Sequence, residues 1–245
     1  MPSPRLRMFA GPNGSGKSVL IEELKEKGIP LGPIINADSI LKDLNDKTYL
    51  DLTDYQLNNI TQEHWNTTLE QPDIKTRLLK TGKTPLIEIS ENTLLCKDKF
   101  IDSYSAAIIA DFLRYQLVDQ KVSFSFETVM SHRSKIDFLT YVKEKGYTSY
   151  LYFISTEDPE ININRVENRV KKGGHSVPIN KIKDRYYRGM SLLLDALKAA
   201  NRAYLLDNSQ EQNFVILEKK YDGMMYPKVR NMPNWFDTYV TDKLP

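Results

Sequence analysis

Residues 11–18 of this 245-residue sequence, Gly-Pro-Asn-Gly-Ser-Gly-Lys-Ser, are the stretch best suited to chemistry. They fit the pattern G-x-x-x-x-G-K-[ST], in which successive backbone N–H groups wrap a phosphate at the positive end of the following helix. The lysine would reach the β- and γ-phosphates, and the last serine would bind Mg²⁺. The sequence therefore predicts a site for ATP or GTP with Mg²⁺, with Ser18 as the metal ligand. Its residues are Gly11, Pro12, Asn13, Gly14, Ser15, Gly16, Lys17 and Ser18.

A phosphate-binding loop of this kind lies between a strand and a helix, and the sequence supplies both. Leu6–Ala10 is a short apolar run typical of a buried strand. Residues 19–26 place leucine and isoleucine on one side of a helix that ends near Gly28. The alternative is a plain glycine-rich turn, but such a turn would not need a strand before it and a helix after it. We therefore interpret residues 11–18 as a P-loop (Walker A motif).

Two carboxylates at the ends of predicted strands could act on a phosphoryl acceptor. Asp38 follows a strand expected at 34–36, and Glu127 ends a strand expected at 122–126. The carboxyl ends of parallel strands line one crevice. Asp38 is our candidate for the base that takes the acceptor's proton, and Glu127 for binding substrate hydroxyls. The alternatives are that Asp38 caps the next helix and that Glu127 begins one.

Positive charge is concentrated between Arg165 and Arg188. This segment holds eight Lys or Arg residues against two acids, whereas the whole chain has a formal net charge of only +2. Arg165 and Arg169 share a face of a helix expected at 159–170; Arg185 and Arg188 lie on a helix expected at 180–200. Arginines on a mobile lid can stabilise a transferring phosphoryl group and exclude water. The alternative is a solvated basic helix pair.

Strands alternate with helices through most of the sequence, which predicts an α/β fold with a mainly parallel sheet flanked by helices. Further helices are expected at 105–117 and 134–145, and further strands at 150–154, 203–206 and 214–217. We expect one domain with a core at about 5–44 and 105–218. Residues 45–104 would be an insertion or helical subdomain, with one helical segment near 55–69 and a turn at 71–73. Residues 219–245 would be a C-terminal extension.

Composition excludes several classes of protein. Hydrophobic residues make up 40% and charged residues 27% of the sequence. No apolar run approaches the roughly 18 residues that cross a membrane, so we expect a cytoplasmic protein without a membrane partner. Cys96 is the only cysteine, and His64, His132 and His175 lie too far apart in sequence to suggest a metal site. The small net charge argues against a nucleic-acid partner.

Four segments give the sequence a family resemblance: residues 11–18, Ile-Asn-Ala-Asp at 35–38, Phe-Ser-Phe-Glu-Thr at 124–128, and the basic segment 165–188. Within the last, residues 173–178 read Gly-Gly-His-Ser-Val-Pro. Together they resemble the zeta toxin family of P-loop kinases over about residues 5–44 and 105–209. The Gly-Gly-His-x-Val-Pro lid, which recurs in small zeta-like proteins, is the most specific of the four.

The resemblance implies a kinase that transfers the γ-phosphate of ATP or GTP to an alcohol group of a small molecule. Better-known members phosphorylate UDP-N-acetylglucosamine, and an antitoxin protein would be the partner. By motif, Lys17 matches the phosphate-binding lysine, Asp38 the base and Glu127 the substrate-binding glutamate. Arg169 and Arg185 match the phosphate-contacting lid arginines. Thr128, Arg165 and Arg188 complete the expected substrate-binding set.

The sequence also departs from the family pattern. Zeta toxins often have threonine two residues after the glutamate, and here that position is Val129, with Thr128 beside it. The identity of the acceptor therefore stays open, as does toxicity. The tail with Trp235 and Phe236 has no counterpart in the pattern. Two other hypotheses remain: a kinase acting on nucleic-acid ends, and a nucleotide-binding protein without catalytic activity.

Overall fold

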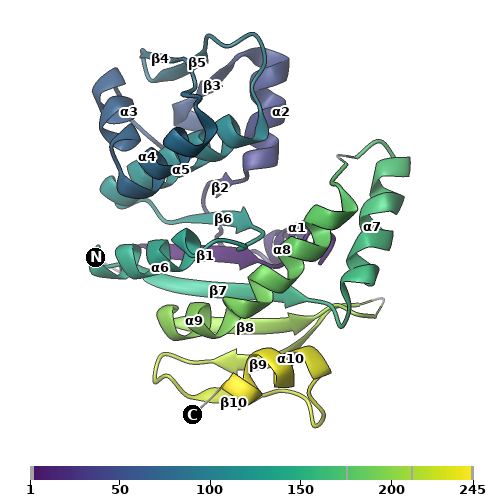
Figure 1. Cartoon of the computed structure of the whole chain (residues 1–245). Coiled ribbons are helices and arrows are strands. Elements are labelled where there is room, and N and C mark those ends of the chain that lie inside the picture. Colours follow the sequence, from purple (N-terminus) through teal and green to yellow (C-terminus); the bar gives the residue numbers. More distant parts are fainter. Residues whose placement is uncertain (1–2, 175, 211, 244–245) are drawn as a thin grey trace. The chain divides into compact units, whose positions relative to one another are not determined.

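The computed structural model describes residues 3–174, 176–210 and 212–243. The chain forms two compact units. The first combines the residues up to Pro30 with those from Glu127 onward, and the second is Leu31–Phe126. Both carry strands and helices (Figure 1), and the expected α/β fold with mainly parallel strands is confirmed. The division into core, insertion and extension stays a prediction.

The first unit is built on a sheet with the strand order β10-β9-β8-β7-β1. Strands β1 (Arg5–Ala10), β7 (Thr148–Ser155) and β8 (Arg202–Asp207) are parallel neighbours, with Met8 opposite Leu151 and Leu151 opposite Ala203. Strands β9 (Phe214–Lys219) and β10 (Met225–Pro227) extend the sheet in antiparallel pairing. Because β1, β7 and β8 run the same way, their carboxyl ends meet at one edge, where ligands bind in such sheets.

The helices of the first unit are α1 (Lys17–Glu26), α6 (Ser134–Glu144), α7 (Pro159–Lys171), α8 (Ile179–Ser191), α9 (Leu193–Ala199), α10 (Asn234–Tyr239) and the 3₁₀ turn η2 (Thr241–Lys243). The single helix expected at 180–200 was wrong, since the structure breaks it at Leu192. There the N–H of Leu192 bonds to Gly189 O, three residues back, and Ser191 Oγ donates to Arg188 O. Both bonds compete with the regular α-helical pattern and end α8.

The second unit contains β2 (Ile34–Ile35), α2 (Ala37–Lys47), β3 (Tyr49–Asp51), η1 (Leu52–Tyr55), α3 (Gln62–Leu69), α4 (Pro72–Thr81), β4 (Ile87–Ser90), β5 (Thr93–Cys96) and α5 (Ser103–Asp119). Strand β2 pairs in parallel with β6 (Phe124–Thr128), and β3, β5 and β4 form a separate antiparallel sheet. Sequence analysis missed α4, which follows the expected turn and starts with proline at its first position, where the missing N–H costs nothing.

A buried charge cluster stabilises the second unit. Asp111 on α5 is 1% exposed and forms ion pairs with Arg77 on α4 and Arg114 on its own helix. The Arg114 guanidinium carbon lies 4.6 Å from the centre of the Phe126 ring. Burial lowers the pKa of Arg114 to about 9 and also lowers that of Arg77. The buried Arg114 and the partly buried Arg77 therefore share one buried carboxylate, and Arg77 Nη2 also lies 4.0 Å from Asp73 Oδ2.

We expect Asp111→Ala to lower the free energy of unfolding by about 3–5 kcal/mol, because it leaves the buried Arg114 and the partly buried Arg77 without their shared carboxylate. Chemical denaturation followed by circular dichroism measures this. Asp119→Ala, at the exposed end of the same helix, is the matched control. Equal stability of the two variants would contradict a stabilising role for the cluster.

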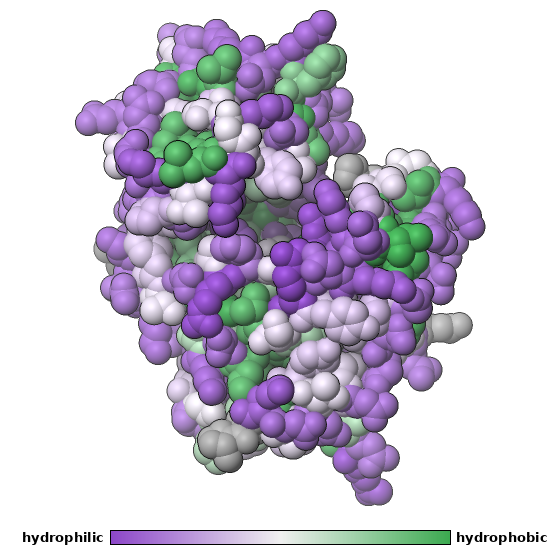
Figure 2. All heavy atoms as spheres, in the orientation of Figure 1, coloured by the Kyte–Doolittle hydropathy of each residue, from purple (hydrophilic) through white to green (hydrophobic). Residues whose placement is uncertain are grey.

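No helix in the described part of the chain is long and apolar enough to cross a bilayer. The face shown in Figure 2 is mainly hydrophilic, with scattered small apolar areas. Apolar areas of this kind are normal on a globular surface.

Candidate nucleotide-binding and phosphoryl-transfer site

The predicted P-loop connects β1 to α1, and its backbone lies where only glycine fits. Gly11 has a φ of 143°, and a Cβ there would lie 2.1 Å from the carbonyl oxygen of Ile154 on β7. Gly14 has a φ of 75°, and its Cβ would lie 2.7 Å from the carbonyl oxygen of Asn162 on α7. Both angles fall in the left-handed region that favours glycine. The loop is therefore packed tightly against the strand and helix that flank it.

Lys17, the first residue of α1, bends back over this loop. Its ammonium Nζ donates to the carbonyl oxygens of Gly11 at 2.9 Å and Pro12 at 2.8 Å. The residue is only 6% exposed. A buried ammonium needs such partners, because removing it from water is costly. The charge is thus held at the loop that the sequence predicts to bind phosphates.

Glu127 reaches the same place from the end of β6. Its Oε2 accepts a hydrogen bond from Ser18 Oγ at 3.1 Å, and its Oε1 lies 3.8 Å from Lys17 Nζ. The structure therefore brings Lys17, Ser18 and Glu127 together, as sequence analysis expected for one cleft. Glu127 lies in the strand and not at the start of α6, which begins seven residues later at Ser134.

The residues of this loop fit a nucleotide phosphate with Mg²⁺. Two glycines admit a close backbone approach, and the buried hydroxyl of Ser15 has no hydrogen-bond partner within the part of the chain that the structure describes. The Ser18 hydroxyl and the Glu127 carboxylate offer oxygen atoms of the kind that Mg²⁺ prefers. In nucleotide sites Mg²⁺ commonly takes only one or two protein ligands and completes its shell with phosphates and waters.

Asp38 lies in the second unit, in the first turn of α2. The expectation that Asp38 could cap this helix was wrong: the N-cap is Asn36, whose Oδ1 accepts from the N–H groups of Asp38 at 2.8 Å and Ser39 at 3.3 Å. Asp38 itself is exposed. Its carboxylate is not needed to start the helix, so it is available for chemistry. Its role as the base stays a prediction.

Helices α7 and α8, which sequence analysis predicts to be a lid, lie side by side (Figure 1) and pack through Ile163, Val166, Val177 and Ile182. On α8, Arg185 Nη1 lies 3.4 Å from Asn13 Oδ1 of the P-loop. Arg188, by contrast, is paired with Asp184 on the exposed side of α8. His175 of the lid motif lies outside the described residues.

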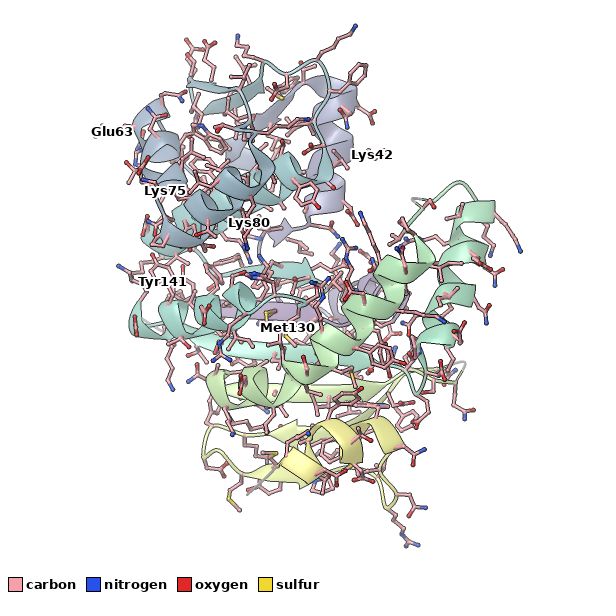
Figure 3. The ribbon with its side chains drawn as sticks, in the orientation of Figure 1. Lys42, Glu63, Lys75, Lys80, Met130 and Tyr141 are labelled. Carbon is pink, nitrogen blue, oxygen red and sulfur yellow. The ribbon has the colours of Figure 1, made fainter. Side chains whose placement is uncertain are left out.

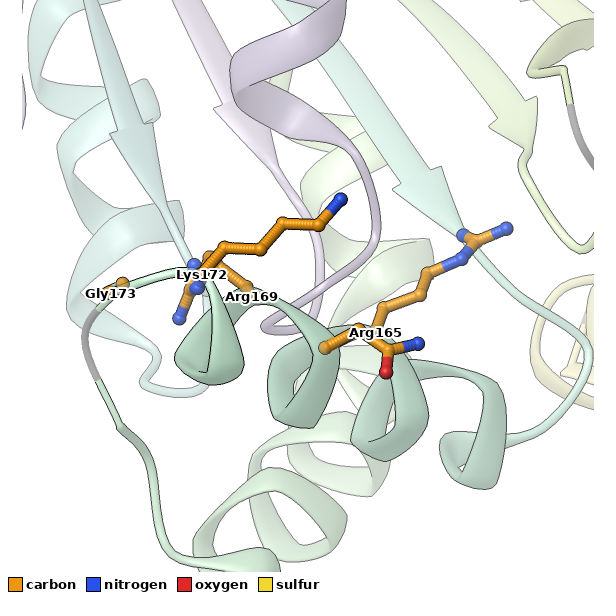
Figure 4. Close-up of a pocket in the computed structure, with 6 residues that line it drawn as sticks. Arg165, Arg169, Lys172 and Gly173 are labelled. Carbon is orange, nitrogen blue, oxygen red and sulfur yellow. The ribbon is translucent and has the colours of Figure 1, made fainter.

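A pocket of about 480 Å³ lies along α7 and the start of the loop after it. Figure 4 shows the residues that line it, which are Arg165, Asn168, Arg169, Lys172, Gly173 and Gly174. Three of these six residues are cationic, so the pocket suits an anionic ligand. The roles of Arg169 and Arg185 in holding phosphoryl oxygens, and of Arg188 in substrate binding, stay predictions.

Arg165 was predicted to bind substrate, but in the structure its guanidinium group donates to backbone carbonyl oxygens of this chain. Its Nη1 donates to the carbonyl oxygen of Asn208 at 2.7 Å, and its Nη2 donates to that of Gln210 at 2.9 Å. The guanidinium group therefore ties α7 to the loop after β8. A role for Arg165 in substrate binding stays a prediction beside this structural one.

Sequence analysis missed Asn162, which joins the lid to the P-loop. This residue of α7 is fully buried, and its Nδ2 donates to the carbonyl oxygen of Asn13 at 2.9 Å. Its Oδ1 accepts from Thr156 Oγ1 at 2.5 Å. Tyr186 on α8 donates to the carbonyl oxygen of Thr156 at 2.7 Å, and burial raises the pKa of this tyrosine. A polar residue on the apolar side of the predicted helix was the one available signal for Asn162.

With this geometry described, the comparisons with known proteins can be set beside it. Residues 104–219 match the zeta toxin family model. The predicted resemblance to zeta toxins is confirmed. The matched region contains Glu127 and all four lid arginines. An uncharacterized protein from Haemophilus influenzae is 35% identical over 69 residues, which are 28% of this chain and 49% of that relative. The chain therefore matches about half of the relative's length.

Solved structures show the same fold as this zeta toxin-like chain. The AvrRxo1-ORF1:AvrRxo1-ORF2 crystal structure with sulphate ions has a TM-score of 0.60 at 14% identity, covering 99% of this chain and 65% of that one. A structure of the same pair with ATP has a TM-score of 0.60 at 15% identity, with the same coverage. The PezAT toxin–antitoxin system of Streptococcus pneumoniae has a TM-score of 0.50 at 15% identity, covering 89% of this chain and 72% of that one.

The turn after Glu127 is where the chain departs from the zeta toxin pattern. Thr128 Oγ1 accepts from the N–H of Met130 at 3.1 Å, and Met130, labelled in Figure 3, is buried with a φ of 55°. A Cβ on Gly189 of α8 would lie 3.3 Å from the carbonyl oxygen of Val129. The Thr128 hydroxyl thus stabilises a turn that packs closely against α8. Its predicted contact with substrate stays a prediction.

Proposed function

We propose that this chain is a nucleotide-dependent kinase of the zeta toxin type. It transfers the γ-phosphate of ATP or GTP, with Mg²⁺, to a hydroxyl group of a small molecule, and a sugar nucleotide such as UDP-N-acetylglucosamine is the acceptor class. The observation that carries the proposal is the meeting of Glu127 with Lys17 and Ser18 at the P-loop. The family match over residues 104–219 supports it.

In this mechanism Lys17 leaves the carbonyl oxygens of Gly11 and Pro12 and binds the β- and γ-phosphates. Ser18 would hold Mg²⁺, which would neutralise phosphate charge when bound. Asp38 takes the proton from the acceptor hydroxyl as its oxygen bonds to the γ-phosphorus and the bond to the β,γ-bridging oxygen breaks. Arg169 and Arg185 stabilise the charge that develops on the transferring oxygens. The acceptor therefore gains a phosphate, and ADP or GDP is released.

The direct test is consumption of ATP and GTP by the purified chain with Mg²⁺, across UDP-sugars, free sugars and oligonucleotides. We expect consumption that depends on a sugar nucleotide, with a phosphorylated sugar nucleotide detected by mass spectrometry. Transfer to oligonucleotide ends alone would replace the proposal with a nucleic-acid kinase. Tight nucleotide binding without transfer to any acceptor would favour the non-catalytic hypothesis.

Glu127→Gln should distinguish the effect of this carboxylate on phosphate binding from its predicted role in binding the acceptor hydroxyl. In the structure its negative charge lies beside the groups that would bind phosphate, so its removal should strengthen Mg²⁺-free ADP binding several-fold through lost like-charge repulsion. If Glu127 also binds the acceptor hydroxyl, the same variant should raise the acceptor KM. Isothermal titration calorimetry and steady-state kinetics measure the two effects.

Glu22→Gln, on the exposed side of α1 and paired with Lys25, is the matched control and should change neither quantity. If Glu127→Gln bound Mg²⁺-free ADP no more tightly than the wild-type chain, the carboxylate would not compete with phosphate at this loop.

The proposal includes a protein partner. The AvrRxo1 structures contain a second chain, and PezAT is described as a toxin–antitoxin system. An antitoxin that blocks the nucleotide or acceptor site would control a kinase of this kind. Co-expression with the protein encoded beside it, followed by co-purification, tests this part of the proposal separately from the activity.

A further inference from the structure

The segment Asp207–Ser209, directly after β8, joins several parts of the nucleotide site. Asn208 Nδ2 donates to the carbonyl oxygen of Ser15 in the P-loop at 2.8 Å, and the Asn208 N–H donates to that of Ser155 at the end of β7 at 2.8 Å. Ser209 Oγ accepts from the N–H of Glu157 at 2.8 Å. With the bond from Arg165 Nη1 to the carbonyl oxygen of Asn208, this short segment contacts the P-loop, the end of β7 and helix α7.

The C-terminal helix α10 is attached to this same segment. Trp235 is 3% exposed, and its Nε1 donates to Asp207 Oδ2 at 2.6 Å. The two oxygens of Asp207 also accept from the N–H and the Oγ of Ser209, each at 2.9 Å. Asp207 is itself 3% exposed. A buried carboxylate must be satisfied by donors, and one of its three comes from a residue 28 positions away in the sequence.

We propose that Trp235 and Asp207 are positioning residues that set nucleotide affinity through Asn208; we call this contact the tail latch. This inference rests on the proposed nucleotide-binding role of the P-loop. The tryptophan N–H fixes the Asp207 carboxylate, the carboxylate fixes Ser209, and the turn between them directs the Asn208 amide onto Ser15. Without the latch, the carbonyl of Ser15 loses its fixed donor and the loop is less well ordered for phosphate.

A double-mutant cycle tests the tail latch in the full-length chain. The Kd of Mg²⁺·ADP and of Mg²⁺·GDP is measured by isothermal titration calorimetry for the wild type, Trp235→Phe, Asn208→Ala and the double variant. Trp235→Phe keeps an aromatic ring but removes the N–H. We expect it to weaken binding about fivefold or more, as for a lost hydrogen bond to a charged group. Because Trp235→Phe and Asn208→Ala interrupt the same chain of hydrogen bonds, the double variant should bind nucleotide no more weakly than Asn208→Ala alone.

Phe236→Leu is the matched control, since it changes the buried neighbour of Trp235 on α10 without touching Asp207. It should lose comparable thermal stability and keep its nucleotide affinity within about twofold of the wild type, a difference smaller than one lost hydrogen bond. In kinetic assays, Trp235→Phe should raise the nucleotide KM and leave the acceptor KM unchanged. If the C-terminal tail had only a structural role, Trp235→Phe and Phe236→Leu would change nucleotide affinity by similar amounts.

The outcomes separate the latch from the proposed function. The latch would be overturned if Trp235→Phe bound nucleotide as tightly as the wild type. It would also be overturned if the losses of affinity in the two single variants added fully in the double variant. Either result would leave the kinase proposal standing. A wild-type chain that binds neither nucleotide would overturn both. Weaker binding in Trp235→Phe that disappears in the Asn208→Ala background supports the latch.

Discussion

Lys17→Met is expected to lower phosphoryl transfer on the order of 100- to 1000-fold, the cost of removing one group that stabilises transition-state charge. Methionine keeps most of the side-chain length while removing the charge that the structure holds at the carbonyl oxygens of Gly11 and Pro12. The loss should appear mainly in kcat, because the charge on the γ-phosphoryl group grows in the transition state. Acceptor-dependent nucleotide consumption measures it.

The matched control for this change is Lys25→Met, on the same helix. Lys25 is paired with the exposed Glu22 and lies away from the P-loop contacts. It should leave kcat unchanged. Retention of full transfer in Lys17→Met would rule out the phosphate-binding role of this lysine. The Kd of nucleotide for the same variant shows whether the Lys17 charge also stabilises the bound nucleotide before transfer.

Asp38→Asn should lower kcat by about 100- to 10,000-fold if Asp38 is the general base, because asparagine cannot take the acceptor's proton. The structure makes this a clean substitution. Asn36, not Asp38, caps α2, so the change costs the helix only the few tenths of a kcal/mol that a first-turn acid contributes. Steady-state kinetics with a saturating acceptor concentration measures this loss.

Asp46→Asn, near the other end of α2 and exposed, controls for charge and helix stability. It should match the wild type in rate. If Asp38→Asn kept its kcat while its acceptor KM rose, Asp38 would be a binding residue, and the base would have to be sought elsewhere on the chain.

The parts of the site that could be predicted from sequence are those encoded locally. Glycines with positive φ, a preceding apolar strand and a following helix lie within about twenty residues, so the P-loop was recognisable. Helices were also expected at 159–170 and 180–200, where the charge between Arg165 and Arg188 lies; the structure has α7 and the shorter α8 there. The fold class followed from alternation of the elements, and the structure confirms it.

The contacts that hold the site together could not be predicted, because they join distant positions. Asn162 bonds to Asn13 across 149 positions, and Trp235 bonds to Asp207 across 28. Neither residue belongs to a motif with a known mechanism. In the second unit, β3, β4 and β5 are only three or four residues long, too short for a clear alternating pattern. Sequence analysis therefore defined only one helical segment in residues 45–104 and did not define these strands.

The buried amide of Asn162 has a mechanical consequence for the lid. It fixes the first turn of α7 to the P-loop, Arg165 fixes the next turn, and Tyr186 fixes α8 at Thr156. The helix pair is thus a hairpin held by side-chain hydrogen bonds at the end that lies beside the P-loop. Arg185 lies next to these contacts, with its Nη1 3.4 Å from Asn13 Oδ1, whereas Arg169 lies seven residues beyond Asn162 on α7, where it lines the pocket.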